Sequence, residues 1–363
     1  MRRVRVAAGL APYDVLIGDG ALSAGRLRRA LKDGAEGLVV SSRTVMDLHG
    51  DVLDETLRRA GFTSRRTLLL PDGEGAKTAR AWEQTVKAMA RAGLDRSSFV
   101  IAFGGGSIGD AAGFAAATYM RGIRFIQVPT TLLSMVDSSV GGKTGINLGE
   151  GKNLVGSFHQ PSLVLADLSF LKTLPAREKQ SGVYEILKCG FLRSPRLLEL
   201  IERTSGLRRA SWTELESAIA AAVSVKARIV ERDERESGER VLLNLGHTLG
   251  HALEAATAYR VFTHGEGVGY GMEFAVDLGE SLGVTPRLAA RRMRKAIQAV
   301  GPRLAIQPET APLAGRATLV DKKRQGATLR EVLLASPGRP VVREMNAKDF
   351  ANRAGIWLAA KAV

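Results

Sequence analysis

The middle of the N-terminal half reads Phe99-Val100-Ile101-Ala102-Phe103-Gly104-Gly105-Gly106-Ser107-Ile108-Gly109-Asp110. An apolar run typical of a buried strand leads directly into a glycine-rich turn, and an alanine-rich helical segment follows. Gly104, Gly106 and Gly109 match the pattern G-x-G-x-x-G in the strand, turn and helix context that this motif requires. Backbone amides and a helix N-terminus in such a turn can bind a pyrophosphate. The stretch therefore predicts an α/β domain that binds a dinucleotide.

Other apolar runs on both sides of this turn extend the α/β pattern. Buried strands are expected at residues 37–40, 67–70, 99–103, 125–128 and 163–166, with longer amphipathic stretches between them. From Pro175 onward the hydrophobic periodicity becomes helical, and helices are expected at residues 177–191, 212–232, 242–256, 268–282 and 286–300. The pattern predicts a Rossmann-like α/β domain over residues 1–172 and a mostly α-helical domain over residues 173–363.

Composition restricts the class of protein. The chain has 363 residues, of which 45% are hydrophobic, so it can bury two cores. Its single cysteine, Cys189, fits a reducing compartment, and no apolar stretch is long enough to span a bilayer. We therefore expect a cytoplasmic protein without a membrane partner.

The net charge is +15, from 52 basic and 37 acidic residues. Such a charge fits nucleic acid, an anionic substrate or an arginine-rich proteome. The basic residues are scattered and lack interleaved aromatic residues or a known nucleic-acid-binding motif, so no nucleic-acid partner is expected.

Three of the five histidines fall close together, at His247, His251 and His264. Imidazole is the commonest protein ligand of catalytic divalent metals and an acid or base near neutral pH. His247 and His251 are four residues apart, so on a helix they share one face and favour a common ion or substrate. A buried helix with hydrogen-bonded histidines is the alternative interpretation.

A second polar segment follows the strand expected at residues 125–128. Residues 128–144 combine hydroxyl side chains with Asp137 and Lys143, and Lys152-Asn153 follow shortly afterwards. This composition favours a wall that binds an anion, with a plain surface loop as the alternative.

Taken together, these residues resemble the 3-dehydroquinate synthase family of sugar phosphate cyclases. The resemblance extends from Tyr13-Asp14-Val15-Leu16-Ile17-Gly18 to Asp321-Lys322-Lys323. It implies an NAD-dependent enzyme that converts 3-deoxy-D-arabino-heptulosonate 7-phosphate into 3-dehydroquinate and phosphate. It also implies a homodimer and a divalent metal, zinc or cobalt.

The family pattern also implies residue roles. The metal ligands would be Glu185, His247 and His264, whereas the spacing argument favours His251 as the partner of His247. The implied NAD contacts are Asp72, Gly73, Glu74, Gly75, Ala76, Lys77, Gly106, Ser107, Ile108, Gly109, Asp110, Thr130, Thr131, Lys143, Lys152, Phe170, Leu171, Lys172 and Thr173. The implied substrate contacts are Arg121, Asp137, Lys143, Asn153, Lys188, Lys226, Arg240, Asn244, His251 and Lys322. So many cations suit a ligand with a carboxylate and a phosphate.

Two features concern the cofactor site in particular. No Asp or Glu occurs at residues 124–130, where a ribose-binding acid is expected about 20 residues after the glycine motif, and Glu74 is the candidate replacement. Ser42-Arg43-Thr44 stand where the family usually has an Asp and an Asn near the adenosine, so NAD affinity is the property that this departure is expected to affect.

Three alternatives stay open at this point. A sister cyclase that makes 2-deoxy-scyllo-inosose, 2-epi-5-epi-valiolone or amino-dehydroquinate would share the fold, metal and NAD. A metal-dependent alcohol dehydrogenase similar to glycerol dehydrogenase would share the architecture but accumulate NADH. A basic nucleic-acid-binding protein would not need Glu185, His247 and His264, and its DNA binding would weaken steeply with salt.

Overall fold

The computed structural model describes residues 1–9, 12–31, 36–62, 66–320, 324–325 and 327–363. The chain forms two compact units. The first comprises Met1–Pro175 together with Lys226–Arg235, and the second comprises Ala176–Val225 together with Glu236–Val363. The functional division after residue 172 stays a prediction.

A seven-stranded sheet forms the centre of the first unit. The strand order is β1-β2-β9-β6-β5-β3-β4, and all neighbours pair in parallel except β1 with β2. The strands of this sheet are β1 (Arg2–Val6), β2 (Tyr13–Gly18), β3 (Gly37–Ser42), β4 (Thr67–Leu70), β5 (Phe99–Gly104), β6 (Arg124–Pro129) and β9 (Leu163–Asp167). Every residue of β5 and β9 is buried, as expected for parallel strands that are covered on both faces.

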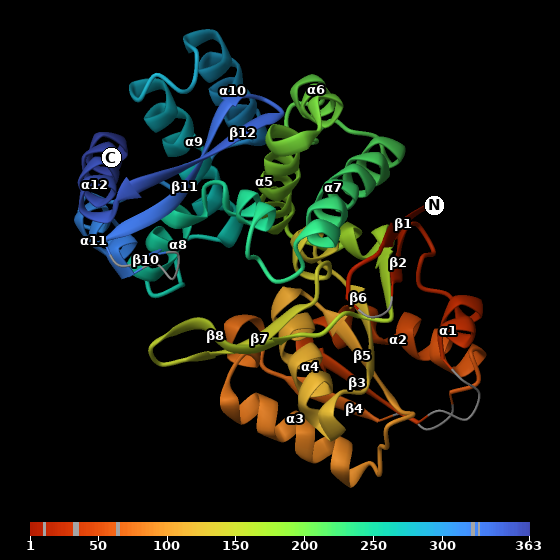
Figure 1. The fold of residues 1–363 in the computed structure, drawn as a ribbon. Coiled ribbons are helices and arrows are strands. Elements are labelled where there is room, and N and C mark those ends of the chain that lie inside the picture. The colour runs from red at the N-terminus through yellow and green to blue at the C-terminus, as the bar shows by residue number, and fades with distance from the viewer. Residues whose placement is uncertain (10–11, 32–35, 63–65, 321–323, 326) are drawn as a thin grey trace. The chain divides into compact units, whose positions relative to one another are not determined.

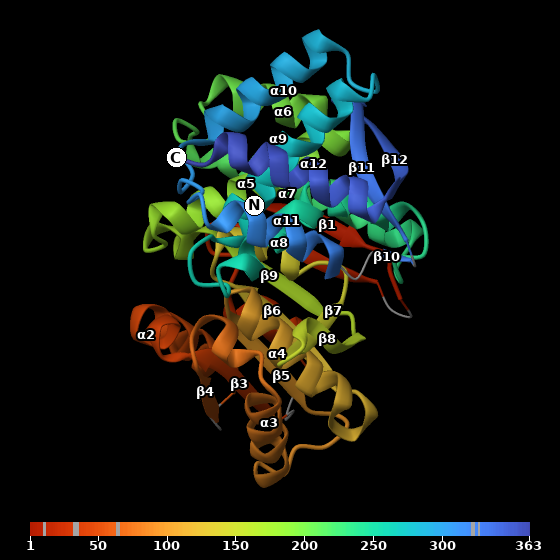
Figure 2. The same cartoon turned by 90° about the vertical axis from the view of Figure 1, so that its left-hand side faces the viewer.

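Among the described residues, the first unit also contains four further α-helices and a hairpin, besides the end of one helix from the second unit. They are α1 (Ala24–Ala30), α2 (Arg43–Arg59), α3 (Ala79–Arg91), α4 (Gly106–Thr118), β7 (Lys143–Leu148) and β8 (Gly151–Phe158). Helix α4 packs on β5 and on the hairpin strand β7, and α3 packs against α4 (Figures 1 and 2). The buried residues of α4 are mostly alanine and glycine, which lets its backbone lie close to the sheet.

Helices dominate the second unit. They are α5 (Ala176–Arg193), α6 (Pro195–Arg203), α7 (Trp212–Arg232), α8 (His247–Ala256), α9 (His264–Ser281), α10 (Arg287–Val300), α11 (Thr310–Ala317) and α12 (Ala347–Lys361). The last turns of α7 belong to the first unit. Helix α9 packs against α5, α8 and α10 (Figure 2), and 14 of its residues are buried, as expected for a central helix. Among the described residues, no helix has the length and hydrophobicity that a membrane crossing requires.

The α/β class of the first unit and the helical character of the second are confirmed. The five expected strands correspond to β3, β4, β5, β6 and β9, and the expected helix at residues 212–232 has the bounds of α7. Two helix starts are wrong. The helix expected from residue 268 is α9, which begins four residues earlier at His264. The helix expected from residue 242 begins later. Residues 242–244 belong to a 3-10 turn, Glu239–Asn244, and α8 begins only at His247. Gly246 precedes it with a φ of +77°, a left-handed conformation that interrupts a continuous helix.

The second unit also contains a small sheet that the sequence reading did not predict. It consists of β10 (Arg324–Gln325), β11 (Thr328–Ser336) and β12 (Arg339–Asn346), paired in that order and antiparallel. The strand β11 packs against α9, so this sheet helps to cover the central helix of the unit.

Candidate active site

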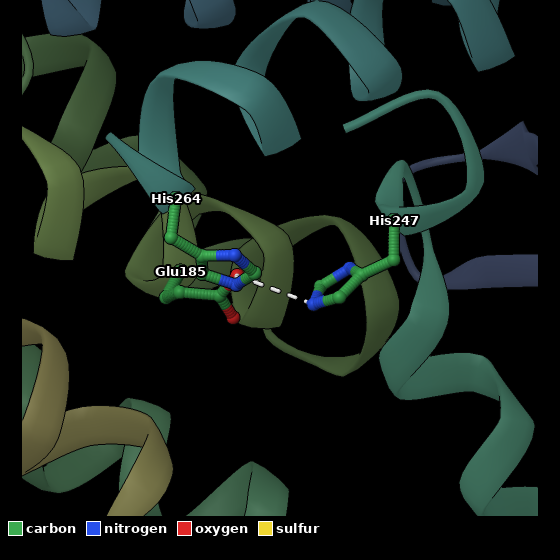
Figure 3. Close-up of side chains that lie close together, drawn as sticks. All are labelled: Glu185, His247 and His264. Carbon is green, nitrogen blue, oxygen red and sulfur yellow. Dashed lines mark ion pairs between the residues drawn. The ribbon is translucent and has the colours of Figure 1, made fainter. Parts of the chain in front are cut away.

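The side chains of Glu185, His247 and His264 converge in the second unit, each from a different helix. Figure 3 shows the three side chains pointing toward one another from α5, α8 and α9. The Nε2 atoms of His247 and His264 lie 3.8 and 3.7 Å from Oε1 of Glu185. Glu185 and His247 are buried, and His264 is partly exposed. One end of the cluster is thus enclosed by protein and the other is accessible.

Two close backbone contacts explain why these helices can present their side chains to one point. A Cβ atom on Gly265 would overlap the carbonyl oxygen of Ser181 in α5, so glycine allows α9 to begin directly against α5. Gly246, just before α8, lies equally close to Gly271 of α9. These glycines bring the helix that carries His264 near the helices that carry Glu185 and His247.

The start of α9 is fixed by a capping box. Thr263 and Glu266 exchange side-chain to backbone hydrogen bonds across the first turn, which contains His264. Arg177 donates two hydrogen bonds to the Glu266 carboxylate, from Nε at 3.0 Å and Nη2 at 2.6 Å. Burial raises the pKa of Glu266, but the bonds from Arg177 and Thr263 outweigh it and hold that pKa below its usual value. The carboxylate therefore stays ionised in its cap.

The three donor atoms fit a divalent metal of the zinc type. Bonds of about 2.0–2.2 Å in a tetrahedral arrangement separate two ligand atoms by roughly 3.4 Å. The observed separations of 3.7 and 3.8 Å from Glu185 Oε1 lie close to this value. Two imidazoles and one carboxylate are also a known ligand set of catalytic zinc, with further positions open to a substrate. Lys188 pairs with the other oxygen of Glu185.

His251 has a different environment from His247. It is exposed, and its ring centroid lies 5.3 Å from that of His247 and 5.8 Å from that of His264. A second group of donor atoms that could hold a metal contains His251, Glu254 and His264. The helical spacing of four thus places His247 and His251 near each other, but the two belong to different donor groups.

The remaining predicted substrate contacts of the second unit lie just before α8. Arg240 is 2% exposed, and the Nδ2 atom of Asn244 donates to Oε1 of Glu236 at 2.6 Å. Glu236 was not among the predicted residues, and a lone acid in a polar stretch carries no sequence signal. Lys322 lies outside the described residues.

In the first unit, the glycine-rich turn has the expected form. Gly104 ends β5 and α4 starts at Gly106. A Cβ atom on Gly106 would lie 2.8 Å from Oγ of Ser138, and one on Gly109 would lie 2.6 Å from Oε1 of Gln127. A larger residue at either position would have to displace a neighbouring side chain. Ser107 and Ile108 lie in the same first turn of α4.

Several predicted NAD and substrate contacts gather around the start of α4 and the β7–β8 hairpin. The Nζ atom of Lys77 pairs with Oδ2 of Asp110 at 2.6 Å and also donates to Asn153. Lys152 lies 3.3 Å from Oε1 of Glu74, and Asn147 donates to the other oxygen at 2.6 Å. Burial raises the pKa of the Asp110 carboxyl, and the ammonium of Lys77 opposes this shift. Asn147 was missed because no motif contains it.

The other predicted residues of this unit lie on nearby segments. Thr130 is buried at the end of β6, and Thr131 Oγ1 donates to Ser134 Oγ at 2.9 Å. Thr173 Oγ1 lies 2.8 Å from Nε2 of His49, a partner that the sequence reading missed. Asp72, Gly73, Gly75 and Ala76 form or flank the 3-10 turn Gly73–Ala76, and Phe170, Leu171 and Lys172 lie in the turn Leu168–Lys172.

Lys226, which is buried, pairs with the partly exposed Asp137 within the first unit. The Nζ atom of Lys226 lies 2.6 Å from Oδ1 and 2.6 Å from the backbone oxygen of Asp137. Asp137 lies in a π-helical turn, Ser134–Ser138, a conformation often found at functional sites.

Three more residues of the first unit were singled out in the sequence. Arg121 follows α4 with a φ of +67°, and Lys143 begins β7 as an exposed residue. Thr44 is one of the residues at which the sequence departs from the family pattern near the adenosine. Its Oγ1 atom donates a hydrogen bond to Oδ2 of Asp72 at 2.9 Å.

Comparisons with known proteins agree with these observations. Residues 67–181 match the family model described as 3-dehydroquinate synthase N-terminal, and residues 182–324 match the one described as 3-dehydroquinate synthase C-terminal. The 3-dehydroquinate synthase of Halorhodospira halophila (strain DSM 244 / SL1) is 45% identical over 345 residues, which cover 94% of this chain and 95% of that protein.

Solved structures show the same fold. The 2-epi-5-epi-valiolone synthase ValA from Streptomyces hygroscopicus subsp. jinggangensis 5008, with NAD⁺ and Zn²⁺ bound, has a TM-score of 0.86, 28% identity and 99% coverage of both chains. A 2-deoxy-scyllo-inosose synthase complexed with carbaglucose-6-phosphate, NAD⁺ and Co²⁺ has a TM-score of 0.87 at 23% identity, with 98% of this chain and 99% of that chain covered.

Proposed function

The chain belongs to the 3-dehydroquinate synthase family, and on this premise we propose that it converts 3-deoxy-D-arabino-heptulosonate 7-phosphate into 3-dehydroquinate and phosphate. This is a carbon–oxygen lyase reaction of the shikimate pathway. The observation that carries the proposal is the 45% identity to a 3-dehydroquinate synthase over 94% of the chain, compared with 28% identity to the valiolone synthase. The larger identity favours the dehydroquinate branch over the sister cyclases.

NAD and one divalent metal are the cofactors of the proposed enzyme. Glu185, His247 and His264 would hold the metal, which their donor chemistry and spacing support. The glycine-rich turn at the start of α4, with Glu74 and Lys77, would hold NAD. When bound, NAD accepts and returns a hydride, and the metal polarises a substrate hydroxyl oxygen.

The overall conversion oxidises one secondary hydroxyl, releases phosphate, restores the hydroxyl, opens the ring and closes it again by an intramolecular aldol reaction. In this sequence the side chains of the protein chiefly orient the substrate and stabilise developing charge. Removal of the proton that precedes phosphate loss is assigned to the substrate's own phosphate group.

The proposed substrate contacts are mainly cationic or amide side chains. They are Arg121, Asp137, Lys143, Asn153, Lys188, Lys226, Arg240, Asn244, His251 and Lys322. Lys226 is held by Asp137, and Asn244 by Glu236, so both side chains are already oriented without substrate. Fixed cations and amides of this kind suit a ligand with both a carboxylate and a phosphate.

Substrate comparison tests the assignment within the family. The purified enzyme, supplied with NAD⁺ and zinc or cobalt, should turn over the heptulosonate phosphate with a higher kcat/KM than glucose 6-phosphate or sedoheptulose 7-phosphate. Better turnover of either of these two sugars would assign the chain to a sister cyclase instead.

Two variants test whether the cations recognise the substrate carboxylate. Removing one partner of a buried charge pair costs about 2–5 kcal/mol. Lys226→Ala and Arg240→Ala should therefore weaken binding of the heptulosonate phosphate strongly, with a smaller effect on a sugar phosphate that has no carboxylate. Lys87→Ala is the control, because Lys87 is exposed and pairs only locally with Glu83. Equal losses for both ligands would contradict the proposed role.

The proposal also includes the identity of the metal, the oligomeric state and the cellular compartment. Zinc or cobalt is the metal, the enzyme is a homodimer, and it works in the cytoplasm, where the single buried Cys189 would stay reduced. Metal analysis of the protein purified without added metal, sedimentation equilibrium, and fractionation of the source cells test these three points separately.

A further inference from the structure

The ring of His264 lies between two carboxylates. Its Nε2 atom lies 3.7 Å from Oε1 of Glu185, and its Nδ1 atom lies 3.2 Å from Oε2 of Glu254. Glu254 belongs to α8 and is 5% exposed, so its carboxylate is almost fully enclosed. A carboxylate in this position accepts a hydrogen bond from Nδ1–H, which leaves the lone pair of Nε2 directed toward Glu185.

The ring nitrogens of His247 have the same arrangement of contacts, with a different hydrogen-bond acceptor at Nδ1. Its Nδ1 atom lies 3.2 Å from the backbone oxygen of Leu245, and its Nε2 atom faces Glu185. Both histidines thus have an oxygen at Nδ1 and the shared acid at Nε2. The backbone carbonyl at His247 is neutral, whereas Glu254 supplies a side chain that mutation can change.

We propose that Glu254 is a positioning residue that fixes the orientation and tautomer of His264 and thereby strengthens binding of a divalent metal by Glu185, His247 and His264. This inference rests on the proposed metal site but assigns a role to a residue outside it. A hydrogen-bonded carboxylate also makes the imidazole a stronger donor, and loss of such partners typically weakens metal binding about 10- to 100-fold.

A competing arrangement uses the same atoms differently. His251, Glu254 and His264 also offer donor atoms within 4.8 Å of one another, so Glu254 would be a ligand if the metal bound there. In the arrangement proposed here, Glu185 is the ligand and Glu254 acts through His264. The two arrangements predict opposite rankings for substitutions at the two acids, because a direct ligand matters more than a residue behind it.

The test measures metal affinity without substrate, by competition between the purified metal-free protein and a chromophoric chelator for Zn²⁺ and Co²⁺. Glu254→Ala should weaken the affinity about 10- to 100-fold. Glu254→Gln should weaken the affinity less, because the amide oxygen can still accept a hydrogen bond from Nδ1–H of His264. Glu185→Gln should have the largest effect. The visible absorption spectrum of bound Co²⁺ should also change in Glu254→Ala, since the orientation of a ligand ring changes.

Glu273→Gln is the matched control. Glu273 is 4% exposed in the neighbouring helix α9 but pairs with Arg303 and Lys361, away from the histidines. This variant should lose stability and keep the metal affinity. If Glu254→Ala fails to fold, Glu254→Gln decides the question by the same measurement.

Unchanged metal affinity and an unchanged Co²⁺ spectrum in the folded Glu254 variants would overturn the inference. So would a loss in Glu254→Gln that exceeds the loss in Glu185→Gln, because Glu254 would then be a ligand. Neither result depends on turnover. A wild-type protein that bound metal but made no 3-dehydroquinate would refute the proposed function and leave this inference standing.

Discussion

Gly265 of α9 and Ser181 of α5 lie so close that a Cβ atom on Gly265 would overlap the Ser181 carbonyl oxygen. The Gly265 N–H also donates to Ser181 Oγ at 3.0 Å. Because His264 precedes Gly265, this contact sets the distance between His264 and the helix that carries Glu185.

Gly265→Ala should push the start of α9 away from α5. We expect a loss of about 1–3 kcal/mol in the free energy of unfolding, the usual cost of overpacking, together with weaker metal binding. Chemical denaturation and metal titration measure the two effects. Gly355→Ala is the control, because nothing lies within 4 Å of a Cβ there, and it should leave metal affinity unchanged. Wild-type affinity in Gly265→Ala would show that the contact does not position His264.

Removal of the metal should abolish turnover. Treatment with a chelator should inactivate the enzyme and added zinc or cobalt should restore it, because Glu185, His247 and His264 offer a catalytic ligand set. His264→Ala should stay inactive under the same conditions. His159→Gln, which changes a histidine whose ring bonds the backbone of Ile123, should respond to metal like the wild type. Full activity of His264→Ala after exhaustive chelation would rule out the site.

Glu74→Ala tests the proposed ribose contact. A hydrogen bond to a charged group is worth roughly 1.5–3 kcal/mol, so the Kd for NAD⁺ should rise about tenfold or more. Isothermal titration calorimetry measures this directly. Glu83→Ala, which removes an exposed acid that pairs with Lys87, should leave the Kd unchanged. The same affinity in both variants would remove Glu74 from the cofactor site.

Glu273 should make stability depend on pH. Burial raises its pKa, but Arg303 and Lys361 outweigh burial and hold the pKa below the usual value of 4.5. The unfolded chain then binds this proton more readily, so the stabilisation is complete above pH 4.5 and is lost as the pH falls through the folded-state pKa.

Glu273→Gln should therefore destabilise the protein at neutral pH, on the order of 3 kcal/mol, because Arg303 and Lys361 lose the charge of their buried carboxylate partner. The difference from the wild type should shrink as the pH falls below 4.5, because protonated Glu273 resembles glutamine. Urea denaturation at several pH values measures it. A difference that stays constant with pH would contradict the ion pairing.

The sequence predicted the central sheet well because β3, β5, β6 and β9 are buried on nearly every residue and read as continuous apolar runs. The strand β1 gave no such signal. Its exposed residues are Arg2, Arg3 and Arg5, and charged side chains suit an edge strand. The hairpin of β7 and β8 was missed for a related reason, because no residue of β8 is buried and half of its residues are exposed.

The predicted metal ligands show what spacing cannot reveal. Glu185 lies 62 residues before His247 in the chain, and the packing of both α5 and α8 against α9 brings the two together. The spacing argument therefore favoured His251, four residues from His247, and the family resemblance supplied Glu185 and His264. Glu254 had a weak signal, since it lies three residues after His251 on the same helix face.

The central claim is that NAD is restored in every cycle while phosphate is lost and the carbon skeleton closes. The most direct measurement follows phosphate, 3-dehydroquinate and NADH absorbance together in one reaction of the purified enzyme with the heptulosonate phosphate and a small amount of NAD⁺. We predict that phosphate and 3-dehydroquinate form in equal amounts, well beyond the amount of NAD⁺, with no net NADH at steady state. NADH that accumulated in proportion to substrate consumed, without phosphate release, would show a simple dehydrogenase and contradict the account.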